Sequence, residues 1–244
     1  MHFDKILEKI TSGKKALALL IDPDKHSTET LIHLVNIANT TPQPDVILVG
    51  GSIVFNGIEE TIATLKEHTS IPIFIFPGNA FQVAKNADGI LLLSLISGRN
   101  PEFLIGNHVL SAPLIKKHKL EIIPTGYMLI NSGTDTSVLY MSNTSPIPYR
   151  KNDIAIATAL AGEQLGLKMI YLEAGSGAEK PVSNEMISAV KENLKIPIIV
   201  GGGIKTKSQL EQVLNAGADI VVIGTAAENT PEIIREFSQT VAEF

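Results

Sequence analysis

The chain has 244 residues, of which 44% are hydrophobic, and its formal net charge is −5. This length allows two small domains or one α/β barrel. The acidic balance, without a stripe rich in Lys and Arg, argues against a nucleic-acid partner. The sequence contains no cysteine, which excludes disulfides, thiolate zinc sites and a cysteine nucleophile, and it favours a cytoplasmic location.

The N-terminal stretch MHFDKILEKI predicts a helix rather than a signal peptide, because acids and lysines are mixed into a helical pattern. The longest apolar run, GILLLSLI at residues 89–96, is too short for a transmembrane helix and is typical of a buried strand. Any membrane contact is therefore expected to be peripheral.

Short runs rich in Val, Ile and Leu recur along the chain and predict eight strands, at residues 16–22, 45–50, 72–77, 89–94, 120–127, 168–173, 197–201 and 219–224. Runs that are apolar throughout are typical of a parallel sheet covered on both faces. Helical spacing predicts helices between them, among others at residues 28–39, 57–68, 153–165 and 206–216. We therefore expect one domain over residues 1–244, an α/β protein with a (β/α)8 TIM barrel. An open doubly wound sheet is the second interpretation, weakened because no GxGxxG follows the first strand.

Two connections depart from the regular alternation of strands and helices. Residues 78–88 (GNAFQVAKNAD) have room only for a short helix or an irregular turn, which predicts an abbreviated third crossover. Residues 128–152 are long and rich in Ser, Thr, Asn and Pro. Loops of this length in compact domains are typically lids or binding loops, and the alternative is a disordered excursion.

Polar and glycine-rich segments follow the predicted strands, where barrels of this kind build their active sites. They are DPDK at 22–25, GGS at 50–52, YLEAGSG at 171–177, GGGIK at 201–205 and GTAAEN at 224–229. Glycines in such turns let backbone N–H groups approach an anion closely, and phosphate sites after strands seven and eight recur in barrels. Together these segments predict a phosphate site, although GGG alone would also fit an ordinary tight turn.

Glu173 places a carboxylate beside the predicted phosphate site. An ionised carboxylate accepts strong hydrogen bonds from O–H donors, which favours a bond to a substrate hydroxyl. The alternative is a salt bridge to Lys205 or Lys180.

Asp22 and Ser52 end adjacent strands and form a second polar centre. Sparse oxygen ligands, completed by water and substrate phosphates, are typical of Mg²⁺ sites. The ordinary alternatives are a helix N-cap at Asp24 and a turn residue at Ser52.

The segments LIDPDK, ILVGGS, IFPGN, YLEAGSGA, VGGGIK and GTAAEN, in this order over nearly the whole chain, resemble the geranylgeranylglyceryl phosphate synthase family, which includes bacterial heptaprenylglyceryl phosphate synthases. The resemblance implies a barrel without a regular third helix. The implied activity is a prenyltransferase that joins geranylgeranyl diphosphate to the 3-hydroxyl of sn-glycerol 1-phosphate, with Mg²⁺ and release of diphosphate. It also implies a homo-oligomer, a dimer or a hexamer.

The matched segments carry the site residues. The resemblance implies Asp22 and Ser52 as metal ligands. Archaeal members commonly carry a lysine just before DPD, where this chain has Ile21, and this departure leaves Lys25 as the expected diphosphate contact. The implied glycerol 1-phosphate site comprises Tyr171, Leu172, Glu173, Ala174, Gly175, Ser176, Gly177, Gly202, Gly203, Gly224 and Thr225. Asp22 is expected to act in catalysis by helping to stabilise the leaving diphosphate. Glu173 is expected to orient the glycerol hydroxyls and to accept the proton, a role that the departing diphosphate could also take.

The prenyl tail needs a dry path, because each buried CH₂ contributes about 0.8 kcal/mol. We expect a groove near strands three and four that includes Phe74, Phe76, Phe81 and residues 89–96, partly closed by residues 128–152.

Two other functions compete with the transferase. A phosphosugar isomerase or aldolase needs an acid or base partner for Glu173, and a non-catalytic barrel for phospholipid headgroups or scaffolding has no use for Asp22.

Overall fold

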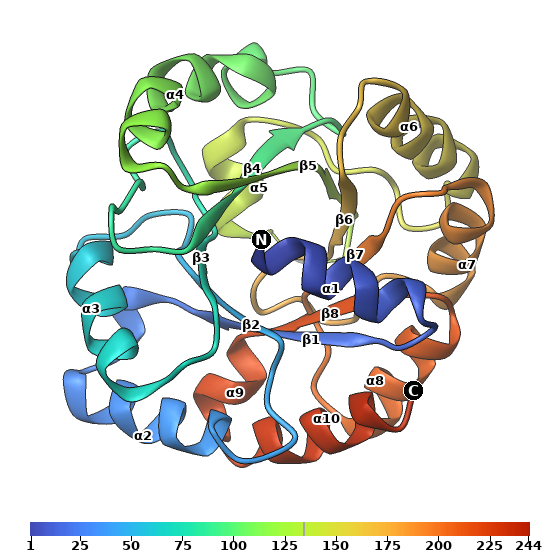
Figure 1. Cartoon of the computed structure of the whole chain (residues 1–244). Coiled ribbons are helices and arrows are strands. Elements are labelled where there is room, and N and C mark those ends of the chain that lie inside the picture. Colours follow the sequence, from blue (N-terminus) through green and yellow to red (C-terminus); the bar gives the residue numbers. More distant parts are fainter. Residues whose placement is uncertain (134) are drawn as a thin grey trace.

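A computed structural model describes residues 1–133 and 135–244. Within them, parallel strands form one closed barrel in the order β1 to β8 (Figure 1). The strands are β1 (Ala16–Ile21), β2 (Val46–Val49), β3 (Ile73–Ile75), β4 (Gly89–Leu95), β5 (Glu121–Leu129), β6 (Met169–Glu173), β7 (Ile198–Gly201) and β8 (Ile220–Ile223). The barrel closes where β1 pairs with β8, with Ala18 beside Val222. The predicted (β/α)8 barrel is confirmed, and the open sheet is excluded.

Helices surround the barrel (Figure 1). They are α1 (His2–Thr11), α2 (Thr28–Ala38), α3 (Ile58–His68), α4 (Asn107–His118), α5 (Ser137–Ser142), α6 (Asn152–Gln164), α7 (Asn184–Asn193), α8 (Lys207–Asn215), α9 (Thr225–Asn229) and α10 (Ile233–Ala242), with the short turns η1 (Pro23–Lys25) and η2 (Glu102–Gly106). Side-chain caps fix several starts: the Ser27 hydroxyl accepts the Thr30 N–H, and Thr206 with Gln209 forms a capping box on α8. Among the helices of the described residues, none is long and apolar enough to cross a membrane.

Alternation along each strand divides the core into two layers. On β6, Ile170 and Leu172 pack outward beneath the helices, whereas Met169 and Tyr171 fill the barrel interior. The inner layer is covered at the amino end of the strands by α1, whose Phe3 and Ile6 pack on it. The carboxyl end of the barrel is therefore left to form a site.

Buried charge links neighbouring strands at the amino end. Asp219, directly before β8, accepts the Ile198 N–H of β7 at 2.9 Å and pairs with Lys15 and Lys191. Asp45 and Asp88 repeat this arrangement before β2 and β4, with the backbone N–H groups of Leu17 and Ile73. Each carboxylate is thus hydrogen-bonded and paired, as burial of charge requires.

The third crossover is abbreviated, as predicted. Residues 76–88, all within the described part of the chain, contain no helix. Buried Gln82 holds this segment against the preceding loop, because its amide donates to the Gly51 carbonyl and accepts the Gly78 N–H, both at 2.9 Å. The segment is therefore fixed by side-chain hydrogen bonds in place of helical ones.

Residues 128–152 are folded where the structure describes them. Ile130 pairs with Ile147, which closes the base of the segment, and α5 forms between them. Position 134 lies outside the described residues. The ordered base and the helix favour a binding loop over a disordered excursion.

Candidate functional site

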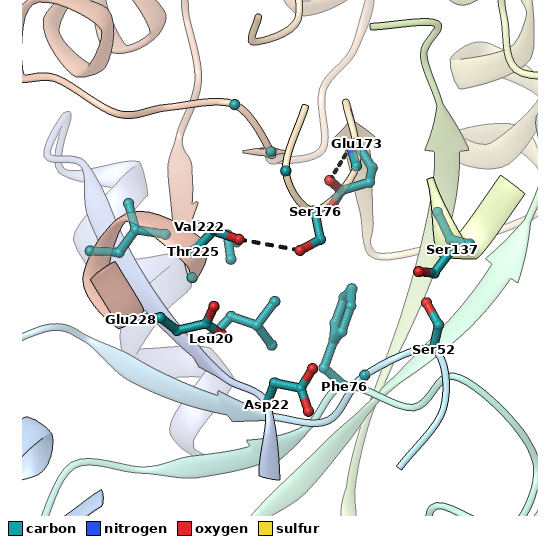
Figure 2. A pocket seen from close by; sticks show the side chains of 18 of the residues that line it. Leu20, Asp22, Ser52, Phe76, Ser137, Glu173, Ser176, Val222, Thr225 and Glu228 are labelled. Atoms are coloured by element: carbon teal, nitrogen blue, oxygen red, sulfur yellow. Dashed lines mark hydrogen bonds between the residues drawn. The ribbon is translucent and has the colours of Figure 1, made fainter. Parts of the chain in front are cut away.

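A cavity of about 310 Å³ opens at the carboxyl end of the barrel, opposite α1. The loops after several strands converge on it (Figure 2). The predicted site residues that line it are Asp22, Lys25, Ser52, Tyr171, Glu173, Gly175, Ser176, Gly177, Gly202, Gly203, Gly224 and Thr225. The structure thus brings together the predicted phosphate and metal residues in one cavity.

Leu172 and Ala174 do not belong to the cavity wall. Both side chains are buried in the outer core layer, because they alternate with Tyr171 and Glu173 along the strand. The Ala174 N–H is also engaged, donating to the Gly201 carbonyl at 3.0 Å. Of the predicted run 171–177, the inward-facing Tyr171 and Glu173 and the glycine turn at residues 175–177 line the cavity.

The glycine turns form a close-packed cradle. Gly202 and Gly203 have φ values of 83° and 73°, a region that favours glycine. A Cβ on Gly202 would lie 2.6 Å from both Glu173 Oε1 and the Gly175 nitrogen. Across the cradle, the hydroxyls of Ser176 and Thr225 are 3.2 Å apart (Figure 2). A side chain at Gly202 would displace the Glu173 carboxylate, and one at Gly203 would collide with the backbone of Lys180.

The first turn of α9 forms the other side of the cradle. Gly224 precedes this helix, and Gly224, Thr225 and Ala226 line the cavity. The first N–H groups of a helix lack partners within the helix and attract anions. The cradle therefore joins backbone donors and two hydroxyls, a combination that suits a phosphate group.

Glu173 lies buried at the end of β6 and reaches into the cavity (Figure 2). Its Oε1 accepts the Gly175 N–H at 2.6 Å. Burial raises the pKa of Glu173, while this N–H and the nearby hydroxyls of Tyr171 and Tyr127 oppose the rise. Among the described residues Glu173 forms no ion pair, so neither Lys205 nor Lys180 neutralises it; Lys180 instead lies over the Tyr149 ring.

An aromatic cluster forms the floor beneath Glu173. Ring centroids of Phe76, Tyr127 and Tyr171 lie 5.2 to 5.9 Å apart in pairs. Burial and the neighbouring Glu173 raise the pKa of both tyrosines well above its usual value, so both phenols are neutral donors. The Tyr171 hydroxyl lies close enough to Glu173 to favour the ionised form of that carboxylate. Its geometry nevertheless leaves the hydroxyl without a hydrogen-bond partner among the described residues. A buried unpaired hydroxyl at a cavity floor suits a polar ligand.

A carboxylate, a lysine and a second carboxylate lie on another side of the cavity. Lys25 Nζ is 2.9 Å from Glu228 Oε2 and 3.9 Å from Asp22 Oδ2. Asp22 Oδ1 accepts the Asp24 N–H at 3.1 Å. Glu228 was missed by the sequence analysis. Its signal was the spacing from Thr225, since residues three apart share one face of a helix.

The alternative that Asp24 is a helix N-cap is wrong. Ser27, not Asp24, caps α2. The Asp24 carboxylate instead accepts the backbone N–H groups of Phe55 and Asn56, at 2.8 and 2.7 Å. This leaves Asp22 as the carboxylate of the DPDK segment that lines the cavity.

Asp22 and Ser52 each place an oxygen donor on the cavity wall, the ligand type that Mg²⁺ prefers. In Figure 2 the Ser52 hydroxyl points toward Ser137, while Asp22 points into the cavity from β1. Within residues 1–133 and 135–244, no three His, Asp or Glu side chains gather into a group that could hold a metal ion. Mg²⁺ usually keeps several waters and binds through one or two carboxylates plus substrate phosphates, so a sparse site of this kind suits it.

A second, smaller cavity of about 70 Å³ adjoins the first, because Tyr127 and Val138 line both. Its wall is mostly apolar and comes from the third crossover, β4 and α4, and it includes Ala80. Leu92, Leu93 and Leu95 of the predicted 89–96 stretch also line it. The groove therefore lies where the sequence predicted it, with Val138 of the 128–152 segment at its edge.

Three aromatic residues predicted for this groove lie elsewhere. Phe74 is buried inside the barrel, because it faces inward on β3, and Phe76 follows two residues later on the same side and lines the main cavity. Phe81 is 88% exposed. The prediction placed these rings by their closeness in the chain, whereas strand alternation sends two of them inward.

The chain is similar to known proteins over nearly its whole length. Residues 9–241 match the model of the PcrB family. A geranylgeranylglyceryl phosphate synthase from Spirosoma linguale is 50% identical, covering 96% of this chain and 94% of the relative. A protein of the same name from Flavobacterium johnsoniae is 54% identical, covering 92% and 93%.

A solved structure shows the same architecture. The crystal structure of (S)-3-O-geranylgeranylglyceryl phosphate synthase from Thermoplasma acidophilum, in complex with substrate sn-glycerol-1-phosphate, superposes with a TM-score of 0.93. The sequence identity is 30%, and the match covers 99% of this chain and 98% of that one.

Proposed function

The chain belongs to the PcrB family, with the geranylgeranylglyceryl phosphate synthases as its relatives, and from this premise we propose the reaction that it catalyses. It joins geranylgeranyl diphosphate to the 3-hydroxyl of sn-glycerol 1-phosphate and releases diphosphate. The observation that carries the proposal is the glycine cradle with the buried Glu173 beside it. Glu173 accepts the Gly175 N–H but forms no ion pair among the described residues. A phosphate site next to a hydroxyl acceptor matches the two ends of glycerol phosphate.

The acceptor substrate binds with its phosphate in the cradle. Backbone N–H groups around Gly202, Gly203 and Gly224 and the hydroxyls of Ser176 and Thr225 hold the phosphate oxygens. Glu173 then accepts a hydrogen bond from a glycerol hydroxyl, and the unpaired Tyr171 hydroxyl supplies a further donor. The bound glycerol is fixed at both ends, which lowers the entropic cost of reaching the donor carbon.

The charge of the cavity supports a divalent cation. Asp22, Glu173 and Glu228 carry carboxylates on its wall, while Lys25 and Lys205 carry ammonium groups, and Lys25 is already paired with Glu228. Two phosphorylated substrates bring several negative charges, and the wall has few positive charges to offset them. We propose that Asp22, with Ser52 nearby, holds Mg²⁺, which when bound offsets the charge of the diphosphate as its C–O bond breaks.

The side chains divide the chemical step between them. As the bond from the glycerol oxygen to the allylic carbon forms, the bond from that carbon to the diphosphate oxygen breaks. The hydroxyl proton passes to Glu173 or to the departing diphosphate, and Lys25 contacts the leaving group. The aromatic floor of Phe76 and Tyr127 faces the carbon that becomes positive, which is favourable for a cation above a ring.

Transfer of label tests the function directly. The purified protein is incubated with radiolabelled sn-glycerol 1-phosphate, prenyl diphosphates of several lengths and Mg²⁺, and then extracted with organic solvent. Label is expected in the organic phase only when a prenyl diphosphate is present. Label that stays in water with every donor contradicts the transferase and favours an isomerase, an aldolase or a headgroup-binding barrel. sn-Glycerol 3-phosphate serves as the matched stereochemical control.

The prenyl tail is proposed to enter the groove beside Ala80. Pockets that enclose drug-sized ligands measure about 300 to 1,000 Å³, whereas the groove measures about 70 Å³. Only the first part of a C20 tail therefore fits there, and the rest continues outward between the third crossover and α5.

Ala80→Trp should shift the donor preference toward shorter chains. The side chain is buried in the groove wall, so a large ring there blocks the path. We expect kcat/KM for the C20 donor to fall about tenfold or more relative to a C10 donor, ~1.4 kcal/mol, with KM for glycerol phosphate unchanged. Ala63→Trp, on the exposed face of α3, is the matched control. An unchanged length preference in a folded Ala80→Trp variant would place the tail elsewhere.

A homo-oligomer stays a prediction, supported by exposed apolar side chains on the outer helices. They are Ile105, Val109, Leu110 and Leu114 of η2 and α4, with Ile154 of α6 and Leu165 after it. Apolar patches of this kind mark protein interfaces. We propose that a second copy covers this surface, and light scattering of the purified protein measures the resulting mass.

A further inference from the structure

Three segments at the open end of the barrel form a surface without charge. Residues 50–57, 76–84 and 136–149 contain no Asp, Glu, Lys or Arg, in a chain with 18% charged residues. We call these segments the apolar rim. They lie together, since Gln82 bonds to Gly51, and Ser52 and Ser137 line the same cavity.

The apolar rim exposes large side chains to solvent. Phe55, Phe81 and Tyr140 are 89%, 88% and 87% exposed. Ile53 and Met141 are exposed beside them. Scattered single hydrophobic residues are normal on a protein surface, but several around one mouth, in segments without charge, indicate a binding surface.

The backbone that carries these aromatic residues is fixed. Asp24 accepts the N–H groups of Phe55 and Asn56. The Asn79 side chain accepts the Phe81 N–H at 2.9 Å. Both rings therefore point to solvent from loops that are held by side-chain hydrogen bonds. A surface prepared in this way loses little conformational freedom when it binds.

The same segments line both cavities. Ser52 and Ile53 belong to the wall of the main cavity, Asn79 and Ala80 to the groove, and Val138 to both. The hydrocarbon path therefore leaves the protein at the apolar rim. A donor and a product that each carry a long prenyl chain reside in lipid, because the chain is insoluble in water.

We infer that the apolar rim docks on the surface of a phospholipid bilayer, with Phe55, Phe81 and Tyr140 entering the headgroup region so that the prenyl chain passes between membrane and groove. This inference rests on the proposed function. Aromatic side chains favour the membrane interface, and docking by apolar side chains does not need anionic lipid. Binding to neutral vesicles is therefore expected to be insensitive to salt, in contrast to binding through charged groups.

The absence of tryptophan from the chain allows a direct test. Phe55→Trp and Phe81→Trp each place one fluorophore on the apolar rim. Thr11→Trp is the matched control, because Thr11 is exposed at the end of α1, which covers the amino end of the barrel. With phosphatidylcholine vesicles and no substrate, the two rim variants should show a blue shift and quenching by brominated lipid. The control should show neither. Equal responses from all three, or none from any, overturn the inference.

Sedimentation with the same vesicles measures the contribution of the rings. Phe55→Ser combined with Phe81→Ser should lower the vesicle partition coefficient about tenfold or more relative to wild type. Ile122→Ser, an exposed apolar position at the amino end of β5, should leave it unchanged. An unchanged partition of the double variant overturns the inference, and so does a change in its oligomeric mass without lipid, which would make the apolar rim a protein interface. Because no substrate is present, these results do not depend on the label-transfer assay, which tests the proposed function separately.

Discussion

Asp22→Ala is expected to abolish prenyl transfer while leaving the protein folded. Asp22 supplies the carboxylate at the end of β1 that lines the cavity, and its structural contacts are a bond from the Asp24 N–H and a long ion pair with Lys25. Losing that bond costs about 1 kcal/mol of stability. Losing the proposed metal ligand removes stabilisation of the leaving diphosphate, and a fall in kcat of about 10³ or more, ~4 kcal/mol, is expected.

A binding measurement separates the metal role from a general loss of activity. Inorganic diphosphate should bind to the wild-type protein in calorimetry only with Mg²⁺, and Asp22→Ala should bind it weakly with or without the metal. EDTA should reproduce the effect of the substitution on the wild-type protein. Asp153→Ala, an exposed carboxylate at the start of α6, is the matched control and should behave as wild type. Full activity of the wild type in EDTA would remove Mg²⁺ from the proposal.

Lys25 and Glu228 show why the electrostatics of the site could not be predicted from the sequence. The two residues are far apart in the chain, and only closure of the barrel between β8 and β1 brings them to 2.9 Å. Lys25 was predicted as a diphosphate contact, and the structure places it between the carboxylates of Asp22 and Glu228.

The strands were predictable because each is a short apolar run between polar segments. Predicted and observed bounds differ by at most two residues at either end, as for 72–77 against Ile73–Ile75. The glycine turns were also predictable, since positive φ values at Gly175, Gly177, Gly202 and Gly203 need glycine. The direction in which each side chain points was harder to predict than the position of each strand. The run 171–177 was predicted as one binding stretch, but strand alternation turns Leu172 and Ala174 toward the helices.

Side chains that meet from distant segments were the least predictable. Phe76, Tyr127 and Tyr171 form one cluster, although they come from three different strand ends. An apolar cavity near the abbreviated crossover could be predicted, because a missing helix leaves part of β4 without a covering helix, and its use by a prenyl tail stays a prediction. Which aromatic residues border it depended on the inward or outward orientation of β3, which three residues do not reveal.

Glu173→Gln should lower kcat/KM for sn-glycerol 1-phosphate by about 10² or more, ~2.7 kcal/mol. The amide keeps the shape and can still accept the Gly175 N–H, but it loses the charge that attracts the glycerol hydroxyl and can accept its proton. Stability should not suffer. Burial raises the pKa of Glu173, so ionisation costs the folded state, and the stability present at low pH is lost as pH rises through the folded pKa. The neutral amide avoids that loss.

The pH dependence and the kinetic constants separate the two roles proposed for Glu173. If the carboxylate accepts the proton, kcat should fall as pH falls through its pKa, which lies above the usual value of 4.5, and Glu173→Gln should lack this acidic limb. If it only orients the glycerol, the substitution should raise KM more than it lowers kcat, and the departing diphosphate takes the proton. Glu179→Gln, an exposed neighbour in the same loop, is the matched control. Wild-type kinetics in Glu173→Gln would remove this buried carboxylate from catalysis and leave the glycine cradle as the sole determinant of acceptor binding.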